Sequence, residues 1–436
     1  MLEPLAYVRA VHFAATVMAS GIVLCRFFVA EPAFGLTDGD LSPATARLPA
    51  RWSRVVWVFL AVAVLSGAAW LALLARDIYD APIGEVWSNG GIWTVATQTR
   101  FGQISLIRLG LAVLLALSLA RPTGLRQRQR PGFVPATLAA GFLILPAWSG
   151  HAGAMPGLSG QFDAAADALH LLAAGTWIGG LLPLAMLLAA ARAANGASGP
   201  GRADFAAAAV GRFSLLGMAS VAALLATGVI NTWYEVGSID GLIETPYGRL
   251  VLVKIGLFAA MVGIATINRF HLTPRLPAAG ALRRLQRNCV AETALGLAAV
   301  FVVGFLGTMA PAIHAGHHAA TAAIPAGAAF VHIHSTQGMA EVTITPGRVG
   351  VARARISLLN DDFDPLAAKE VTLTLTAPTA GSKPITRSAS LGADGAWQVA
   401  GIEFSQPGDW MVEVDAVLGP ADRLSIAAPI LIEPKR

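Results

Sequence analysis

The sequence is poor in charged residues: Asp, Glu, Lys and Arg make up only 13% of its 436 residues. Soluble globular domains carry about 25%. Hydrophobic residues make up 55% of the chain, and its mean hydropathy is positive. A chain this apolar cannot bury most of its hydrophobic surface in a soluble fold, so its composition predicts a protein of the lipid bilayer.

The sequence also lacks the signatures of several functional classes. Its two cysteines, Cys25 and Cys289, are too few for a disulfide framework and do not form a CxxC motif. There is no nucleophile triad, phosphate-binding loop or pair of catalytic carboxylates, so we do not expect an enzyme. The isoelectric point is near 9.6, but the basic residues stand in short loops and are not interleaved with aromatic residues. This pattern does not indicate a nucleic-acid partner.

What the sequence has instead is long apolar runs. A membrane-spanning helix needs about 20 mostly apolar residues, and eight segments qualify. They are 5–29, 55–75, 103–120, 133–150, 165–190, 213–232, 249–268 and 289–311. The first is too long for the core of a signal peptide, and Glu3 precedes any Arg, so we expect it to be a retained span.

The basic residues predict the orientation of these spans. They are concentrated in the loops after spans 1, 3, 5 and 7, whereas the opposite loops hold Arg76, Arg100 and little else. The concentrated residues include Arg47, Arg51, Arg121, Arg126, Arg128, Arg130, Arg192, Arg202, Arg269, Arg275, Arg283, Arg284 and Arg287. Because Lys and Arg favour cytoplasmic loops, both chain termini are predicted to lie outside the cytoplasm.

The composition changes after Pro311. A linker rich in Ala and His, 312–328, leads into seven short alternating runs separated by turn residues, which predict an extramembrane β-sandwich of immunoglobulin-like type over 329–436. The runs are FVHIH, AEVTITPG, ARARISLL, EVTLTLTA, WQVAGIEF, DWMVEVDA and LSIAAPILI.

An internal repeat organises the membrane domain, 1–311. His12 is followed by Gly21 after nine residues, and His170 is followed by Gly179 at the same spacing. Segments 99–111 (TRFGQISLIRLGL) and 245–257 (TPYGRLVLVKIGL) also align, as do the two HAG tripeptides at 151–153 and 314–316. We therefore predict a four-span unit duplicated in tandem, with repeats 1–150 and 151–311. An even number of spans per unit places the axis relating them along the membrane normal.

The repeat pairs four histidines as candidate metal ligands. They are His12 with His170 and His151 with His314, all predicted on the outer side. A single histidine near a helix end is ordinarily an interfacial residue, but recurrence at matched positions favours ligands, since imidazole is a common metal ligand. Met155 and Met309 add thioethers, which favour Cu(I).

Other ionisable residues of the spans carry weaker predictions. Arg108 and Lys254 are paired by the repeat, and we expect both to reach the membrane interface along their long side chains. Cys25 and Cys289 are best interpreted as buried structural residues, although thiolates there could also receive Cu(I). Glu292 is either an intramembrane acid linked to proton movement or a helix-end charge at the interface.

The predicted β-domain has its own candidate site. His332 and His334 are two apart in FVHIHSTQGM, and this spacing on a strand projects both side chains from one face. They could bind one Cu(II) ion together with Met339, or they could be ordinary solvent-facing histidines.

Three stretches resemble the copper resistance D (CopD) family of bacterial inner-membrane proteins. They are DALHLLAAGTWIGGL (167–181), the SGHA that precedes it (149–152), and TPYGRLVLVKIGLFAAMVGIATINRF (245–270). The resemblance implies copper as the bound ion and copper handling between periplasm and cytoplasm, with uptake across the inner membrane and a role in copper homeostasis or resistance. The tail resembles the YtkA-like β-domain of some members. The resemblance leaves open a separate periplasmic protein as copper donor.

Two other functions stay open on the sequence alone. Paired histidines on bundled helices also serve as axial haem ligands, which would make the protein a membrane electron carrier. Alternatively, the spans anchor a copper chaperone whose β-domain hands metal to an oxidase. The direction of transport, the oxidation state of copper, the driving force and the oligomeric state do not follow from the residues.

Overall fold

The computed structural model describes most of the chain, which divides into two compact units, Met1–Ile313 and His314–Arg436. We call them the membrane unit and the β-unit. The described residues are 4–34, 43–79, 81–120, 133–149, 157–193, 201–276, 278–309, 312, 325, 327–335, 338–360, 365–377, 383–419 and 422–435.

The membrane unit is helical throughout its described part. Its elements are α1 (Pro4–Cys25), the π-helix η1 (Arg26–Ala30), α2 (Glu31–Phe34), α3 (Pro43–Ala46), α4 (Leu48–Tyr79), α5 (Ile83–Ser88), α6 (Gly91–Gln98), α7 (Arg100–Ala120), α8 (Phe133–Ile144), the 3₁₀-helix η3 (Leu145–Trp148), α10 (Gly157–Ala193), α11 (Gly201–Glu235), α12 (Ile239–Glu244), α13 (Pro246–Ile267), the π-helix η4 (Asn268–Leu272), the 3₁₀-helix η5 (Thr273–Arg275) and α14 (Ala279–Leu306).

Seven of these helical segments are long and apolar enough to cross a membrane, and they confirm a membrane-embedded protein. The eighth predicted span, 133–150, is shorter: α8 has twelve residues and η3 adds four. Helix α11 runs from Gly201 to Glu235, well past the predicted apolar limits of 213–232. Helical hydrogen bonding continues beyond an apolar run because it does not depend on a hydrophobic environment.

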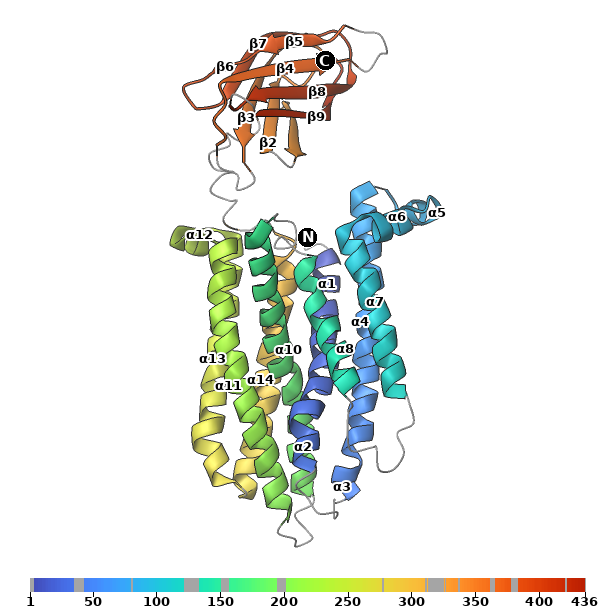
Figure 1. Ribbon diagram of the computed structural model, residues 1–436, viewed down its shortest axis with the longest axis vertical. Coiled ribbons are helices and arrows are strands. Elements are labelled where there is room, and N and C mark those ends of the chain that lie inside the picture. The colour runs from blue at the N-terminus through green and yellow to red at the C-terminus, as the bar shows by residue number, and fades with distance from the viewer. Residues whose placement is uncertain are drawn as a thin grey trace. The chain divides into compact units, whose positions relative to one another are not determined.

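The long helices lie side by side in one bundle, with short helices at its two ends (Figure 1). Helices α5, α6 and α12 lie at the end where α1 begins, and α2 and α3 lie at the opposite end (Figure 1). We call these the α12 end and the α3 end. Helix α10 begins at the α12 end and α14 finishes there (Figure 1).

Helices α1 and α10 form the centre of the bundle. In each, 72% of the most apolar 18-residue window is buried, against 33% or less in the other five long segments. Their backbones meet at Gly21 and Gly179: a Cβ on Gly21 would lie 2.5 Å from the Cα of Gly179, and a Cβ on Gly179 would lie 2.4 Å from the carbonyl oxygen of Val17. Only glycine allows this approach, which brings the two backbones into van der Waals contact.

The described part of the β-unit contains nine strands in two antiparallel sheets. The strands are β1 (Ala329–Ser335), β2 (Gly338–Thr345), β3 (Gly350–Leu359), β4 (Glu370–Thr376), β5 (Ile385–Ser388), β6 (Ser390–Leu391), β7 (Trp397–Phe404), β8 (Gly408–Val417) and β9 (Arg423–Ile432). One sheet has the order β1-β2-β3-β7-β6 and the other β5-β4-β8-β9. The seven predicted strands are confirmed, and β5 and β6 are additional.

The two sheets share one apolar core. Alternate residues of several strands face it, as in β8, where Trp410, Val412 and Val414 are buried and their neighbours are more exposed. The rings of Trp410 and Phe404 meet edge to face with centroids 5.0 Å apart, which joins the two sheets. This core is separate from that of the membrane unit, so the β-unit has its own basis for folding.

Candidate metal and ion sites

His12 lies in α1, where its side chain is only 3% exposed and both ring nitrogens have partners. Nδ1 lies 2.9 Å from the carbonyl oxygen of Ala63 and 3.2 Å from Oγ of Ser66 in α4. Nε2 lies 2.7 Å from Nη1 of Arg108 in α7. A carbonyl oxygen can only accept, so Nδ1 carries the proton and Nε2 accepts from the guanidinium.

Arg108 points into the bundle, which overturns the expectation that it reaches the interface. Its side chain is 7% exposed. Besides His12, it donates to the carbonyl oxygen of Phe142 at 3.2 Å and to Oγ1 of Thr16 at 3.2 Å, and it lies over the Phe142 ring at 4.8 Å. These acceptors satisfy the guanidinium within the protein, so it has no need of interfacial water.

His170 occupies the corresponding place in α10 but has a different set of partners. Its Nδ1 lies 2.9 Å from Oγ1 of Thr227 in α11, and the Thr227 hydroxyl donates to the carbonyl oxygen of Ala223 at 2.7 Å. Because that hydroxyl proton is already engaged, Nδ1 of His170 donates and its Nε2 keeps a free lone pair. Within the described part of the chain no hydrogen bond reaches this Nε2, although Lys254 of α13 interacts with the ring electrostatically.

Three carboxyl groups lie between His170 and the α12 end. Asp163 and Asp167 share its face of α10 at i, i+4 and i+7 spacing, and Glu235 ends α11. Asn231 Nδ2 donates to Asp167 Oδ1 at 2.5 Å, and the Tyr247 hydroxyl donates to Glu235 Oε2 at 2.8 Å. The three carboxyl groups interact electrostatically with one another. We call the group of Asp163, Asp167, Glu235, Asn231 and Tyr247 the acidic row.

Asn231 adds an unsatisfied group to this row. Its side-chain oxygen Oδ1 is buried and has no hydrogen-bond partner among the residues that the structure describes. A buried acceptor without a donor costs about 1–3 kcal/mol, and a cation in the row would relieve that cost. Asp163 and Asp167 were not predicted as site residues, although their i, i+4 and i+7 spacing with His170 was a signal in the sequence for this face. The partners on α11 and α13 required the packed structure.

The other two outer histidines, His151 and His314, and Met155 lie outside the described residues. Met309 is described and packs against an apolar cluster of Tyr247, Val251 and Leu306 at the α12 end. The predicted convergence of four histidines therefore stays a prediction. Among the described residues no group of three or more His, Cys, Asp or Glu side chains is close enough to hold a metal ion.

A second polar cluster surrounds Glu292 near the middle of the 28-residue helix α14. Asn268 Nδ2 donates to Glu292 Oε1 at 2.6 Å, Asn288 Nδ2 donates to Asn268 Oδ1 at 2.6 Å, and the indole of Trp177 also donates to the carboxylate. Glu292 is therefore an intramembrane acid and not a helix-end charge. Cys25 and Cys289 are both buried, as expected of structural cysteines.

The β-unit brings one further group, Glu341, to its predicted copper site. Strand pairing sets His332 opposite Glu341 and His334 opposite Met339. His332 Nδ1 lies 3.6 Å from Glu341 Oε1. His332 and Glu341 therefore form one cross-strand pair, and the register places His334 and Met339 on the same sheet face. The sequence did not reveal Glu341, because the register of β1 and β2 depends on the turn that joins them.

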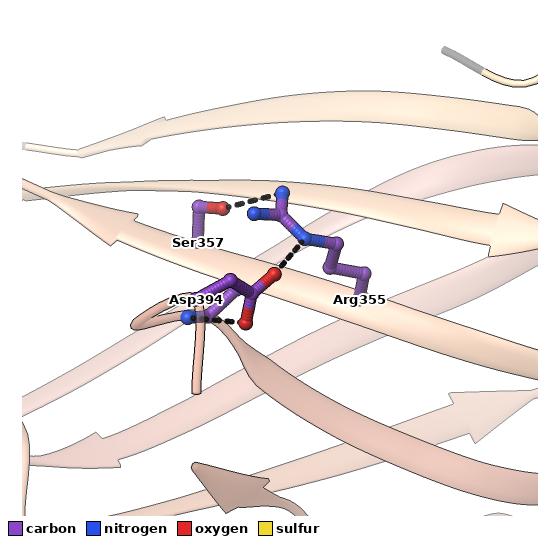
Figure 2. A network of polar contacts seen from close by, with 4 residues as sticks. Arg355, Ser357 and Asp394 are labelled. Atoms are coloured by element: carbon purple, nitrogen blue, oxygen red, sulfur yellow. Dashed lines mark hydrogen bonds and ion pairs between the residues drawn. The ribbon is translucent and has the colours of Figure 1, made fainter. Parts of the chain in front are cut away.

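A hydrogen-bonded network lies on the neighbouring strand. Arg355 Nε donates to Asp394 Oδ2 at 3.0 Å and its Nη1 donates to Ser357 Oγ at 3.3 Å (Figure 2). The hydrogen bond from Arg355, together with one from the backbone amide of Ala396, lowers the pKa of Asp394. Ser357 pairs with Glu341 in the sheet, so this network lies beside the His332–Glu341 pair.

Two family profiles match the membrane unit. "Copper resistance protein D-like, N-terminal domain" matches residues 1–161, and "Copper resistance protein D" matches residues 207–306. The copper resistance protein D of Pseudomonas syringae pv. tomato is 33% identical over 270 residues, which cover 58% of this chain and 85% of that protein. The chain belongs to the copper resistance protein D family.

Two other proteins similar to this chain have different names. The inner membrane protein YebZ of Escherichia coli (strain K12) is 30% identical over 274 residues, 62% of this chain and 84% of that protein. The copper transport protein CutJ of Bacillus subtilis (strain 168) is 26% identical over 352 residues, 79% of this chain and 60% of that protein. No solved structure matches this chain.

Proposed function

We propose that this protein handles copper by moving it across the bacterial inner membrane, and so contributes to copper uptake, homeostasis or resistance. Membership of the copper resistance protein D family supports copper as the cargo. The observation that carries the proposal is His170: a partly buried imidazole with a free Nε2 at the inner end of the acidic row.

The chemistry of this arrangement suits a copper ion entering from the α12 end. Carboxylates at the mouth of a low-dielectric passage raise the local concentration of cations. Imidazole binds copper well, and a neutral nitrogen with a free lone pair is the form that coordinates metal. Among the described residues, the three carboxyl groups outnumber the one nearby ammonium, that of Lys254, so the site attracts cations. In this proposal the α12 end faces the periplasm and both termini lie in the periplasm. The arginines of the loops at the α3 end favour this orientation, because Lys and Arg are enriched in cytoplasmic loops.

The tandem duplication remains part of this proposal, with the α8–η3 segment as the short eighth span. Its support is a series of matched contacts. His12 contacts Ser66 and His170 contacts Thr227, while the Thr99 and Thr245 hydroxyls accept from the amides of Gly102 and Gly248.

Gly21 and Gly179 supply a further argument for the duplication. They touch each other across α1 and α10. Equivalent residues of two repeats can meet only near the axis that relates them, so this contact supports an axis between α1 and α10, along the membrane normal.

The four outer histidines are proposed to capture copper together, with unequal roles. His170 offers a free nitrogen, whereas His12 could coordinate a metal only after Arg108 withdraws from its Nε2. His151 and His314 would complete the set from the helix ends. A haem carrier needs two free imidazole nitrogens that face each other, and the hydrogen bonds of His12 argue against it as one of them.

For the β-unit we propose an immunoglobulin-like sandwich that binds copper at His332 and His334. Glu341 and Met339 on the paired strand would add an oxygen and a thioether ligand. The unit would receive copper from a separate periplasmic donor protein and pass it to the membrane unit. In the chaperone alternative the β-unit carries the whole function and the membrane unit only anchors it. A membrane anchor does not require an acidic row inside its helices.

The test is copper accumulation in cells that express wild type or His170→Ala, with protein in the membrane fraction quantified. We expect His170→Ala to abolish copper-dependent accumulation at unchanged protein level. His271→Ala is the matched control, because His271 is exposed in η4, which follows α13, and should leave accumulation unchanged. Wild-type accumulation in the His170 variant would contradict the proposal.

A further inference from the structure

Glu292 is a buried carboxyl group at the centre of a membrane-spanning helix. It is 1% exposed and lies near the middle of the span Gly280–Leu306. Ionisable side chains at this depth are costly and are usually retained for function. The mechanism proposed for copper capture at the α12 end does not use this group, so its presence needs a separate explanation.

In the described part of the chain, all of the hydrogen-bond donors to Glu292 are neutral. Asn268 and Trp177 donate to the carboxylate, and no ion pair within the described ranges includes it. Among the described residues, the titratable groups facing this region are the thiols of Cys289 on its own helix and Cys25 on α1. The nearest basic residue of η4, Arg269, donates instead to Ser214 of α11. Glu292 is thus free to exchange a proton without breaking a salt bridge.

Glu292 also continues the polar route that begins at the acidic row. Trp177, its hydrogen-bond donor, lies two helical turns after His170 on the same face of α10, about 10 Å along the axis at about 1.5 Å per residue. The indole packs edge to face against Phe258 of α13, with ring centroids 6.0 Å apart. Ionisable groups therefore extend from the α12 end to the centre of the bundle in the second half of the chain.

The described residues of the first half show no such continuation. Arg9 takes the place corresponding to Asp167, three residues before the repeated histidine, and it lies over the ring of Trp70 at 4.9 Å. The hydrogen bond from Arg108 occupies the lone pair of Nε2 of His12. The guanidinium groups of Arg108, which is buried, and of Arg9, which is partly buried, repel a cation. Among the described residues, the second half therefore offers a cation the more favourable route.

We propose that Glu292 couples copper movement to a proton, so that one copper(I) ion exchanges for one proton. This inference rests on the proposed function and extends it to the driving force. Without copper, the carboxyl group holds a proton. When copper(I) arrives, the O–H bond breaks and the proton passes to water on the side from which the copper came. After copper leaves, a proton from the other side restores the O–H bond, and each cycle moves no net charge.

The carboxylate acts here by neutralising the cargo at the depth where a cation is most costly. The described cluster contains only one carboxylate and no imidazole, which suits a single exchangeable proton better than a metal-holding site. The neutral N–H donors of Asn268 and Trp177 stabilise the charged carboxylate during copper passage. They do not compete with the proton, as a fixed positive charge would.

The test uses purified full-length protein in liposomes, with copper(I) supplied outside as a defined complex and a pH-sensitive dye inside. In wild type, we expect copper entry to make the lumen more alkaline. An acidic lumen should speed entry, up to about tenfold per pH unit, the limit for exchange of one proton. Glu292→Gln keeps an oxygen acceptor for Asn268 but has no exchangeable proton, and its copper flux should not respond to the gradient.

Glu244→Gln is the matched control, because Glu244 is exposed on α12, and it should respond as wild type does. Copper entry in wild type without a dye response would overturn the coupling and leave the proposed function standing. An unchanged gradient response in Glu292→Gln would do the same. Absence of any copper flux in wild type would overturn both proposals. The dye response of wild type decides the matter even if the Glu292 variant fails to fold.

Discussion

The guanidinium Nη1 of Arg108 lies 2.7 Å from Nε2 of His12, and this contact joins α7 to α1 inside the bundle. The same guanidinium donates to Thr16 and to the carbonyl of Phe142 on α8. One side chain thus ties three helices of the first half together. The corresponding residue of the second half is Lys254, which acts on His170 only through its charge.

We expect Arg108→Met to destabilise the membrane unit. It removes three hydrogen bonds from a buried cation and leaves Nε2 of His12 without a donor, and each hydrogen bond to a charged group contributes about 1.5–3 kcal/mol. Thermal unfolding of the detergent-solubilised protein should show a lower midpoint. Arg249→Met removes an exposed guanidinium from α13 and should leave the midpoint nearly unchanged.

A double-mutant cycle separates the His12–Arg108 contact from the other bonds of Arg108. The effects of His12→Ala and Arg108→Met should fall short of additivity by about 1–3 kcal/mol, as for residues in direct contact. Strict additivity would mean that the contact adds nothing to stability.

Gly179→Ala should disrupt the centre of the bundle. The new Cβ would lie 2.4 Å from the carbonyl oxygen of Val17 and 2.8 Å from the Cα of Gly21, so α1 and α10 would have to separate. We expect lower yield in the membrane and a lower unfolding temperature, by gel filtration and thermal unfolding in detergent. Gly256→Ala on α13 is the control, since its Cβ would meet no atom within 4 Å. A stable Gly179→Ala protein would show that the helices tolerate the wider spacing.

The sequence predicted helices and strands better than it predicted contacts between residues. Alternation of apolar and polar residues was enough to find the seven longer strands, and apolar runs were enough to find the long helices. The short strands β5 and β6, ITRS and SL, have no apolar face of their own, and their place in the sheets depends on strands that pair with them. Pattern alone could not reveal them.

Arg108 shows why the site was harder to predict than the fold. Judged as a single residue near a helix end, an arginine is expected to reach the interface. Its partners Thr16 and His12 lie more than ninety positions earlier in the chain, so only packing of α1 against α7 could reveal them. Asp167 and Asn231 are a similar case, since they belong to different helices.

The Arg355–Asp394 pair gives the β-unit a weak dependence on pH. The hydrogen bond from Arg355 lowers the pKa of Asp394 in the folded state. Its stabilising effect is therefore full above the unfolded pKa, about 3.9, and is lost as pH falls through the lower folded value. Asp394→Asn should remove this part of the acid sensitivity. Thermal unfolding of the β-unit between neutral pH and about pH 3 measures this acid sensitivity. If the unfolding temperature fell equally with pH in wild type and in Asp394→Asn, the prediction would be wrong.

A fragment beginning at about residue 326 should fold alone and bind Cu(II) through His332 and His334. The separate core of the β-unit supports independent folding. Two ligands of one ion held at about 2 Å each lie about 3–3.5 Å apart, and Nδ1 of His332 lies 3.6 Å from Oε1 of Glu341. A small side-chain movement would let both contact one ion. His332→Ala/His334→Ala should therefore weaken Cu(II) binding by at least about tenfold, and Glu341→Gln less, as measured by calorimetric titration.

The control for this experiment is Glu370→Gln, which changes an exposed carboxylate on β4 in the other sheet. Circular dichroism should show the same strand content in every variant, because His332 lies on the solvent side of its strand and Glu341 opposite it is replaced by a residue of equal size. If the double histidine variant bound Cu(II) as tightly as wild type, both histidines would be ordinary surface residues. The copper-binding role would then belong to the membrane unit, whose Nε2 of His170 is the free imidazole nitrogen nearest to the acidic row.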